Sequence, residues 1–525
     1  MSANLISLSS IRPNKETPWA ALVDGIVIGK DILELLSSSM YVDPMSIYRE
    51  YIQNAADSID EARALGVLGE RAAGRVEIEI DVPKRSIRIR DSGTGISKAE
   101  FVKLLVAFGA STKRGRNARG FRGVGRLAGL GYCQELLFRS GAQGEPAISE
   151  MLWDCRKLRA LLRAADSNHH LRDVVMETVS TRSLEPGKGA GHFFEVEMRG
   201  VIRHRNDQLL DPTAVTRYLS QVAPVPFSPD FRYGGKVCDA LKPYVKLGEL
   251  RIELNGGDSP TYRPHRDTIP VGPGGEDKFE DFETVTVPAL DGGVAAVGWV
   301  LHHGYAGALA PATGIKGLRV RCGNIQVGDD RIFEELFMEP RFNSWTVGEI
   351  HVVDARILPN GRRDHFEQNA HYQNLLTHLT PLARELSRRC RTSSIKRNRS
   401  REFLRQVEVG REKLAIIKQG AVSRAESARL LREVRGQMPE LEKIATGGLF
   451  DESEKTGADR EIQKLNREIR KLGDSDQPAT ALANIPKPQR LVYEKVFSLI
   501  YECAPNRVVA KLLVDRIMAR LGTKE

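Results

Sequence analysis

The pattern of apolar and polar residues predicts an amphipathic helix over residues 48–60, followed by a β-hairpin. Residues 76–82 and 86–90 alternate apolar and polar positions on either side of a Pro-Lys-Arg turn, which is typical of two antiparallel strands. Apolar residues at helical spacing form the core-facing stripe of the helix: Ile47, Tyr51, Ile52, Ala55 and Ile59. The first part of the chain is therefore predicted to combine helices with a sheet.

The opposite stripe of the predicted helix is polar. Glu50, Asn54 and Asp57 lie at positions i, i+4 and i+7, which places an acid, an amide and a second acid in one row. Such groups are costly to half-bury unless a polar partner lies against them. A ligand would be such a partner, but an ordinary solvated helix has the same pattern, so the stripe alone leaves both interpretations open.

Two segments with glycine follow the polar stripe along the chain. Asp91 ends the second strand and is followed by Gly93 and Gly95, so a ligand can approach the backbone while the carboxylate accepts a hydrogen bond. The sequence GFRGVG, from Gly120 to Gly125, precedes an apolar run. Three glycines at this spacing suit a loop whose amide groups face phosphates.

In this order, the polar stripe, the aspartate segment and the glycine loop resemble the GHKL ATPases, a superfamily that includes the Hsp90 chaperones, MutL, type II topoisomerase B subunits, MORC proteins and histidine kinases. Within this superfamily, the motif sequences are most similar to those of Hsp90, in REYIQNAADSID from residue 49 and in GFRGVGRLA from residue 120. The resemblance implies an α+β fold with a Bergerat-type ATPase sandwich, which binds ATP and Mg²⁺ and hydrolyses ATP to ADP and phosphate.

The resemblance also implies a role for each matching residue. Glu50 matches the general base that polarises the attacking water, and Asn54 matches the amide that holds Mg²⁺ against the phosphates. Asp91 matches the acid that binds the adenine amino group, with Gly93 and Gly95 beneath the base. The other positions that match nucleotide-binding residues are Asp57, Ile96, Ser111, Thr112, Lys113, Gly120, Arg122, Gly123, Val124 and Gly125.

Two further features belong to the same predicted domain. Residues 108–122 are rich in glycine and in basic residues, and we interpret them as a mobile lid whose charges meet the phosphates on closure. A flexible basic loop without this role is the other interpretation. His192 stands after Gly191, where the family usually has a threonine that helps to bind adenine.

A second domain is predicted to supply a cation to the nucleotide. The sequences at residues 317–329 and 349–369 resemble the middle domain of Hsp90, which is similar to ribosomal protein S5. The resemblance implies an arginine that reaches the γ-phosphate and stabilises the charge that develops there. Arg363 is the best match, and Arg362 and Lys316 are the alternatives. A basic pair in a surface turn would have the same sequence.

The 525 residues are predicted to form four parts. We expect a GHKL ATP-binding domain over residues 1–225, an S5-like domain over 226–390, a basic helical hairpin or coiled coil over 391–475, and a linker with a small helical domain over 476–525. Within 226–390, residues 256–276 are rich in Gly, Pro and charge, which predicts a long exposed loop. In the third part, Pro439 is expected to interrupt the helix, and short apolar seams favour a hairpin over an intermolecular coiled coil.

Composition indicates which kinds of partner and which cellular compartment are compatible with the sequence. The formal net charge of +10 and the pI of about 9.2 permit an acidic partner such as nucleic acid without requiring one. The sequence has no apolar run of membrane-spanning length and no apparent secretory signal, so no association with a membrane is expected. Six cysteines without a CxxC pair argue against a zinc ribbon or a disulfide framework and favour a reducing cytoplasm.

Two functions are compatible with these features. The first is an Hsp90-like chaperone, a homodimeric clamp that acts on protein clients through ATP-driven lid closure and dimerisation of the ATP-binding domains. The second is an ATPase clamp similar to MORC or MutL, which closes on double-stranded DNA in repair, chromosome compaction or anti-phage defence. The motif sequences favour the chaperone, whereas the positive charge and the helical C-terminal third favour the DNA clamp.

Overall fold

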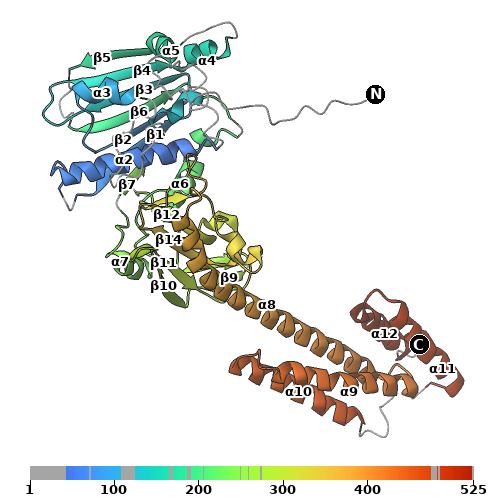
Figure 1. Cartoon of the computed structure of the whole chain (residues 1–525). Helices are drawn as coiled ribbons and strands as arrows, with labels where there is room; N and C mark the ends of the chain where they lie inside the picture. Colours follow the sequence, from blue (N-terminus) through green and yellow to red (C-terminus); the bar gives the residue numbers. More distant parts are fainter. Residues whose placement is uncertain are drawn as a thin grey trace, which may run out of the picture.

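The computed structural model describes residues 43–69, 72–107, 125–164, 170–185, 191–204, 206–248, 250–257, 259–271, 275–473, 482 and 485–522. Over these residues the chain is α+β, as predicted. Two domains that contain sheets lie next to each other, and a helical arm leads away from the second (Figure 1). Among the described helices, none is both long enough and apolar enough to cross a lipid bilayer.

The first sheet has seven strands, in the order β5-β4-β3-β6-β2-β1-β7. Their bounds are β1 Gly74–Asp81, β2 Ser86–Asp91, β3 Glu135–Gly141, β4 Ile148–Asp154, β5 Val179–Leu184, β6 Phe193–Arg199 and β7 Leu250–Leu254. The helices of this domain are α2 Ser46–Ala64, α3 Lys98–Leu105, α4 Cys155–Arg163, α5 Leu171–Thr178 and the 3₁₀ helix η3 Gly125–Gly131. Helix α2 packs on the apolar face of the sheet, which is the predicted arrangement of helix and hairpin (Figure 1).

The first sheet extends beyond the predicted domain boundary at residue 225. Strand β7 pairs with β1 in parallel, with Val76 opposite Ile252. A parallel partner needs a long crossover, and here the crossover contains most of the domain. The boundary at 225 therefore cuts off one strand of the first sheet.

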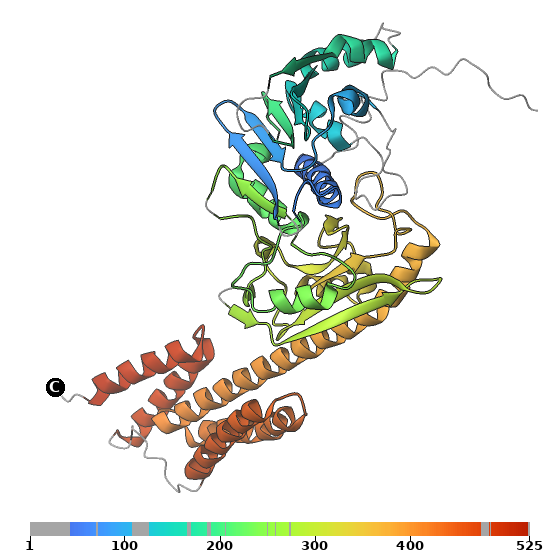
Figure 2. The same ribbon diagram turned by 90° about the vertical axis from the view of Figure 1, so that its left-hand side faces the viewer.

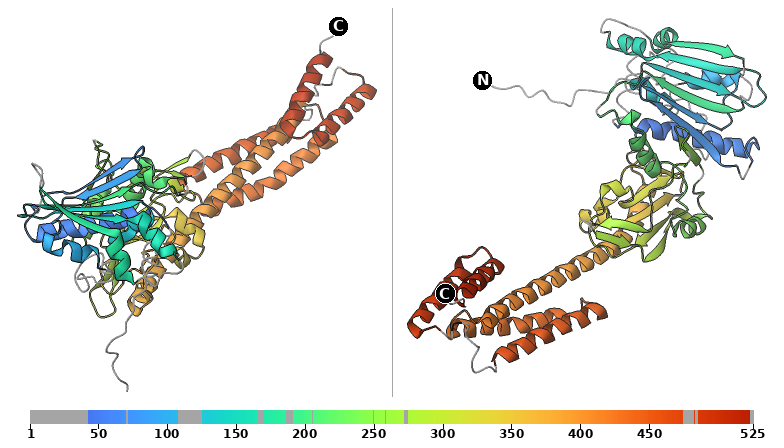
Figure 3. Two further views of the ribbon diagram at one scale, coloured as in Figure 1. Left: turned by 90° about the horizontal axis from the view of Figure 1, so that it is seen from above. Right: turned by 180° about the vertical axis from the view of Figure 1, so that it is seen from behind.

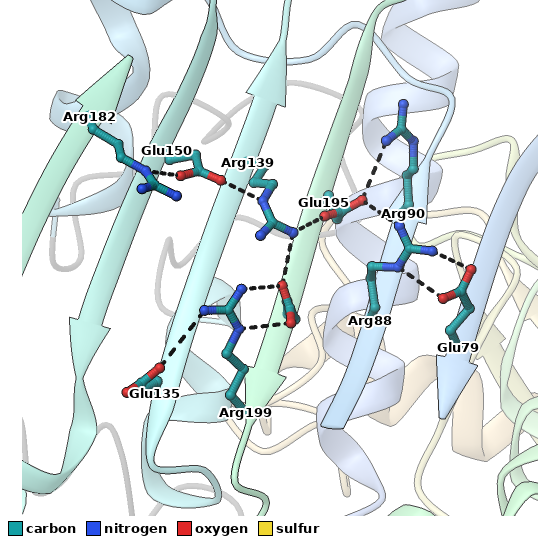
Figure 4. A network of polar contacts seen from close by, with 10 residues as sticks. Glu79, Arg88, Arg90, Glu135, Arg139, Glu150, Arg182, Glu195 and Arg199 are labelled. Carbon is teal, nitrogen blue, oxygen red and sulfur yellow. Dashed lines mark hydrogen bonds and ion pairs between the residues drawn. The ribbon is translucent and has the colours of Figure 1, made fainter. Parts of the chain in front are cut away.

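The other face of the first sheet carries paired charges rather than apolar residues (Figure 4). At its centre, Arg139 donates to Glu150, Glu195 and Glu197 on the neighbouring strands. Glu150 and Glu195 are each only 2% exposed, because arginine side chains cover them. Acids and bases alternate across the strands, so this face is not a basic patch of the kind that binds phosphates.

The second sheet has five strands, in the order β10-β11-β14-β12-β13, and a two-stranded sheet lies beside it. The strands are β8 Thr268–Val271, β9 Gly275–Lys278, β10 Asp281–Pro288, β11 Val294–His302, β12 Gly317–Cys322, β13 Ile325–Val327 and β14 Val347–Val352. Helices α6 Pro212–Val222 and α7 Gly234–Leu241 precede it, and the short 3₁₀ helices are Gln208–Leu210, Pro311–Thr313, Glu334–Leu336 and Pro340–Trp345.

The long exposed loop predicted for residues 256–276 is wrong in part. The segment contains β8, and Arg263 and His265 within it are buried at 2% and 4% exposure. The prediction assumed that charged residues face solvent, but here an ion pair with Glu349 satisfies the buried Arg263 guanidinium.

The helical arm begins inside the second domain. Helix α8 Ala370–Gln419 runs continuously through the predicted boundary at residues 390 and 391, and α9 Arg424–Thr446 and α10 Glu452–Gly473 fold back on it (Figure 2). Phe403, Val407 and Leu414 bury their side chains in the core that these helices share. The apolar seam is therefore used within one chain.

Two smaller features complete the arm. Pro439 lies inside α9 and does not interrupt it, contrary to the prediction, because Met438 and Leu441 on either side are buried in the shared core. Helices α11 Lys487–Cys503 and α12 Arg507–Gly522 pack near the far end of α8 (Figure 3).

Candidate functional site

Helix α2 is fixed along its length, and this sets the direction of its polar stripe. The Tyr48 hydroxyl donates to the carbonyl of Leu209 at 2.7 Å, and the Tyr51 hydroxyl accepts from the backbone N–H of Gly129 at 3.0 Å. Glu50 and Asp57 are each 8% exposed, and Asn54 between them is half-buried. The acid, the amide and the second acid predicted from spacing therefore share one largely buried face of the helix.

The carboxylate of Glu50 lies between two arginines and the start of η3. Arg49 Nε lies 3.7 Å and Arg363 Nε lies 3.9 Å from Glu50 Oε1. On the other side, a β-carbon placed on Gly125 would come within 2.3 Å of Glu50 Oε2. Glycine leaves room for the Glu50 carboxylate at this position, and a larger residue would push that flexible group aside. Position 125, predicted to bind nucleotide, therefore lies directly against the predicted base.

Asp91 lies at the end of β2, beneath the C-terminal half of α2. It is 5% exposed, and its Oδ1 accepts from the backbone N–H of Gly93 at 2.8 Å. Burial raises the pKa of Asp91 to about 7, while hydrogen bonds from Gly93 and from the Ser58 side chain lower it. A β-carbon on Gly93 would lie 2.0 Å from Ser58 Oγ. Asp91 is thus a buried carboxyl group that ionises only at a cost.

The segment after Asp91 has structural reasons for its residues besides any ligand. Gly95 has φ +69°, and a β-carbon there would lie 2.0 Å from the carbonyl oxygen of Gly141. Ile96 donates its N–H to Ser140 Oγ at 2.6 Å. His192 Nδ1 lies 2.6 Å from the carbonyl oxygen of Gly93. A carbonyl only accepts, so Nδ1 of His192 carries a proton and donates it to this bond.

Most of the predicted phosphate-loop and lid residues fall outside the described part of the chain. They are Ser111, Thr112, Lys113, Gly120, Arg122, Gly123 and Val124. Gly125 is the first described residue after this gap.

A tight hairpin of the second domain brings an arginine to Glu50. The hairpin is closed by an isolated bridge between Pro359 and Phe366 and by a hydrogen bond from Asn360 N to His365 O at 2.8 Å. At its tip, Arg363 adopts φ +54°, a conformation that is uncommon for a residue with a β-carbon. The backbone N–H of Gly328 donates to the carbonyl of Arg363 at 2.8 Å and holds this conformation.

The three predicted cations have different positions. The Arg363 side chain is buried beside Glu50, and burial lowers its pKa, an effect that the Glu50 carboxylate opposes. The side chain of Arg362 is exposed, and its carbonyl accepts from Arg49 Nη2 at 2.8 Å. Lys316 pairs with Asp330 at 2.6 Å inside the second domain. The structure therefore places one of the three guanidinium or ammonium groups, that of Arg363, against the carboxylate of Glu50.

Two residues of the site were not predicted from the sequence. Arg49 connects the domains through its bond to the Arg362 carbonyl, and Ser58 contacts Asp91. Only their positions in the sequence could have suggested these two residues, because Arg49 directly precedes Glu50 and Ser58 follows Asn54 by one helical turn.

Comparison with known sequences relates part of the first domain to a family of ATPases. Residues 46–177 match the family described as "Histidine kinase-, DNA gyrase B-, and HSP90-like ATPase". This segment is GHKL-like. The match includes α2 with Glu50, Asn54 and Asp57, as well as Asp91, so all of them lie in a region that resembles this ATPase family.

The similar proteins are chaperones of the Hsp90 type. An endoplasmin homolog of Catharanthus roseus is 28% identical over 183 residues, which is 29% of this chain and 22% of that protein. Chaperone protein HtpG of Yersinia enterocolitica is 23% identical over 205 residues, or 35% of this chain and 32% of that protein. HtpG of Rhodococcus jostii is 35% identical over 81 residues, or 14% and 13%. The chain thus spans less than a third of the length of these relatives.

Proposed function

We propose that this protein binds ATP with Mg²⁺ and hydrolyses it at a site built by both sheet-containing domains. The observation that carries the proposal is the position of Arg363, whose guanidinium lies 3.9 Å from Glu50 although the two residues are 313 positions apart. A buried arginine beside a buried acid supports a catalytic pair, since the acid, Glu50, lies in the segment that matches the GHKL ATPases.

In this proposal the nucleotide lies along α2. Asp91, near Ser58, accepts a hydrogen bond from the adenine amino group, and Glu50 at the other end orients the attacking water. Eight residues of α-helix separate Ser58 from Glu50, which is about 12 Å along the axis and leaves room for the sugar and the phosphates between them. Arg363 stabilises the charge that develops on the γ-phosphate.

The residues on α2 fit a magnesium ion that is held mainly by phosphates and water. Asn54 offers an amide oxygen, and Asp57 lies on the same face one turn further along. In the described residues, no cluster of three or more His, Cys, Asp and Glu side chains forms a metal cage. Mg²⁺ is usually bound by one or two protein groups together with substrate phosphates. When bound, it would neutralise phosphate charge beside Asn54.

We propose further that the protein works as an Hsp90-like homodimeric clamp on protein clients, with residues 108–122 as the lid. Similarity to endoplasmin and HtpG supports this choice. A second support is the apolar surface of α11 and α12, where large aliphatic side chains are 37–62% exposed: Leu491, Val492, Val496, Leu499, Val508, Val509, Leu512, Leu513 and Leu521. An exposed apolar surface of this kind is typical of a site that binds a protein partner.

The alternative, a DNA-binding clamp, loses one of its supports. Residues 396–418 of α8 contain eight basic side chains. Five of them pair with acids of the arm: Lys396, Arg405, Arg411, Lys413 and Lys418. Basic side chains that are already paired with acids neutralise fewer phosphates, so their contact with DNA releases fewer of its condensed counterions. This stretch of α8 therefore offers less positive charge to DNA than its sequence suggests.

The proposed activity is tested by ATP turnover of the full-length protein and of Glu50→Ala. We expect the variant to bind ATP normally but to hydrolyse it on the order of 100-fold more slowly or worse, because the water loses its base. Glu61→Ala is the matched control, since Glu61 is an exposed acid on the same helix. Equal turnover in Glu50→Ala and Glu61→Ala would remove Glu50 from this role.

The same assay, repeated with double-stranded DNA across a salt series, separates the two clamp functions. The chaperone proposal predicts a turnover rate that DNA does not change. Stimulation that grows as salt is lowered would favour the DNA clamp instead.

A further inference from the structure

The segment that leaves α6 is held by buried arginines of the second domain. Arg321, on β12, donates through Nη2 to the carbonyl of Gln221 at 2.5 Å and through Nη1 to that of Ala223 at 3.2 Å. Arg263 donates through Nε to the carbonyl of Val225 at 3.0 Å. The last carbonyls of a helix lack partners within it and attract cations. Arg321 therefore caps the C-terminal end of α6, and the two arginines together hold alternate residues from the end of the helix into the connection.

These arginines are buried around one carboxylate. Arg263, Arg321 and Glu349 are 2%, 1% and 1% exposed. Arg263 bonds to Glu349, and Arg321 Nε lies 2.9 Å from Glu349 Oε1. Burial lowers the pKa of Arg321 to about 9, and for Glu349 the two guanidinium groups outweigh burial and hold its pKa well below the usual value. Buried ion pairs of this kind contribute little net stability compared with apolar packing, so stability alone does not explain the cluster.

A short hairpin connects this cluster to the arginine beside Glu50. Arg321 lies on β12, and Asn324 in the following turn accepts from Arg263 Nη2 at 2.7 Å. After β13, the backbone N–H of Gly328 donates to the carbonyl of Arg363. A β-carbon on Gly328 would lie 2.9 Å from the carbonyl of Asp364, so the hairpin and the arginine loop are in tight contact.

The contacts form a closed ring through both domains. Helix α6 packs against α2, which carries Glu50, and its C-terminal end is capped by Arg321. The β12–β13 hairpin then leads to Gly328 and Arg363, and Arg363 returns to Glu50. The arginine loop is thus positioned from two sides, directly by contact with α2 and indirectly through α6 and the hairpin.

We propose that Arg321 is a positioning residue for ATP hydrolysis, which sets the angle between the two domains so that Arg363 reaches the γ-phosphate beside Glu50. The inference rests on the proposed ATPase function. It implies that the connection after α6, which Arg321 and Arg263 hold and which we call the joint, is rigid. Arg363 is then positioned by the capping of α6 as well as by its own loop.

The test uses Arg321→Lys in the full-length protein. Lysine keeps the positive charge but presents a single ammonium group instead of the planar fork that bonds two carbonyls. We expect kcat to fall about 10- to 100-fold, as it does for small displacements of a reacting group, with KM within about twofold of wild type. Arg341→Lys, at an exposed arginine of the same domain, is the matched control and should keep wild-type kcat.

A double-mutant comparison separates positioning from general damage. If Arg321 acts through Arg363, then Arg321→Lys should change kcat by less than about twofold when Arg363 is already alanine. An equal fold-loss in both backgrounds, or no loss in either, would overturn the proposal. Gln221→Ala removes the bond that Gln221 Oε1 accepts from Arg319 Nη1 at 3.1 Å and the bond that Gln221 Nε2 donates to the Arg217 carbonyl at 2.9 Å. It loosens the same joint and carries the comparison if Arg321→Lys does not fold.

Hydrogen exchange supplies a result that does not depend on activity. The backbone of residues 358–367 should exchange faster in Arg321→Lys than in wild type, because Gly328 and the arginine loop lose their support from the joint. Unchanged exchange there would overturn the proposal even in an active enzyme. If the wild-type protein hydrolyses no ATP, the proposed function fails, whereas faster exchange in this loop would still establish the mechanical connection.

Discussion

Replacing Asp91 with asparagine should stabilise the protein while abolishing nucleotide binding. Asparagine has the same shape as aspartate, its oxygen can accept from the Gly93 N–H, and its amide can donate to the Ser58 hydroxyl. The variant therefore keeps the bonds to Gly93 and Ser58, and it loses the ionisable group together with the bond that the carboxylate accepts from the backbone N–H of Phe194. The adenine amino group, in contrast, loses its charged acceptor and can face a donor.

The size of the stabilisation follows from burial. Burial raises the pKa of Asp91 from 3.8 to about 7, and a rise of this size corresponds to about 4 kcal/mol. Because the folded value lies above the unfolded one, the ionisation cost is absent below pH 3.8. It grows as the pH rises and levels off above about pH 7. After about 1 kcal/mol is subtracted for the lost bond from Phe194, the stability gained by Asp91→Asn should be about 3 kcal/mol at pH 8 and about 1 kcal/mol at pH 5.

The assay is thermal unfolding of both proteins between pH 5 and pH 8, with calorimetric titration of ATP on the same samples. We expect a higher melting temperature for Asp91→Asn, a difference that widens with pH, and no measurable ATP binding. A variant that is less stable at pH 8, or a difference that does not depend on pH, would refute the argument that the folded protein ionises this carboxyl at a cost. Normal ATP affinity in the folded variant would show that the adenine site lies elsewhere.

Two further predictions concern the end of the phosphate loop and the helical arm. Gly125→Ala should lower kcat while changing the melting temperature little, because the new β-carbon displaces only the flexible carboxylate of Glu50; equal kcat in this variant and in the control Gly69→Ala would contradict the contact. Leu512→Glu should shift the protein from dimer to monomer in sedimentation, since it places a charge in the exposed apolar surface of α12. Leu404→Glu, at an exposed residue of α8, is the control and should leave the dimer intact. A dimer that survives Leu512→Glu would rule out this surface as the dimer interface.

Elements with strong local periodicity were predictable from the sequence. The stripe of α2 and the hairpin of β1 and β2 follow from apolar spacing, and the structure has them at Ser46–Ala64, Gly74–Asp81 and Ser86–Asp91. Along β1 and β2, buried side chains alternate with more exposed ones. The polar stripe with Glu50 could also be found in this way, because it depends on helical spacing alone.

Features that depend on distant contacts were not predictable in the same way. The pairing of β7 with β1 joins residues 176 positions apart, such as Val76 and Ile252, and no local signal in the sequence indicates it. Arg263 and Glu349 look like surface residues in the sequence, since their burial depends on each other. The continuity of α9 across Pro439 likewise depends on tertiary packing, which overrides local helix preference.

The contact between Glu50 and Arg363 combines both cases. A resemblance of residues 349–369 to a known loop selected Arg363 before Arg362, but neighbouring arginines cannot be distinguished by spacing. The fold distinguishes them, because the positive φ of Arg363 turns its side chain toward α2 while Arg362 offers its carbonyl to Arg49.

The central claim, that two domains build one hydrolytic site, is tested most directly by comparing Arg363→Ala with Arg362→Ala in the full-length protein. The measurement is kcat for ATP together with the Kd for ATP on the same samples. We predict that Arg363→Ala lowers kcat by on the order of 100-fold or more while the Kd changes by less than about threefold, and that Arg362→Ala stays near wild type. Equal kcat in the two variants, or a loss that appears only in Arg362→Ala, would contradict the account.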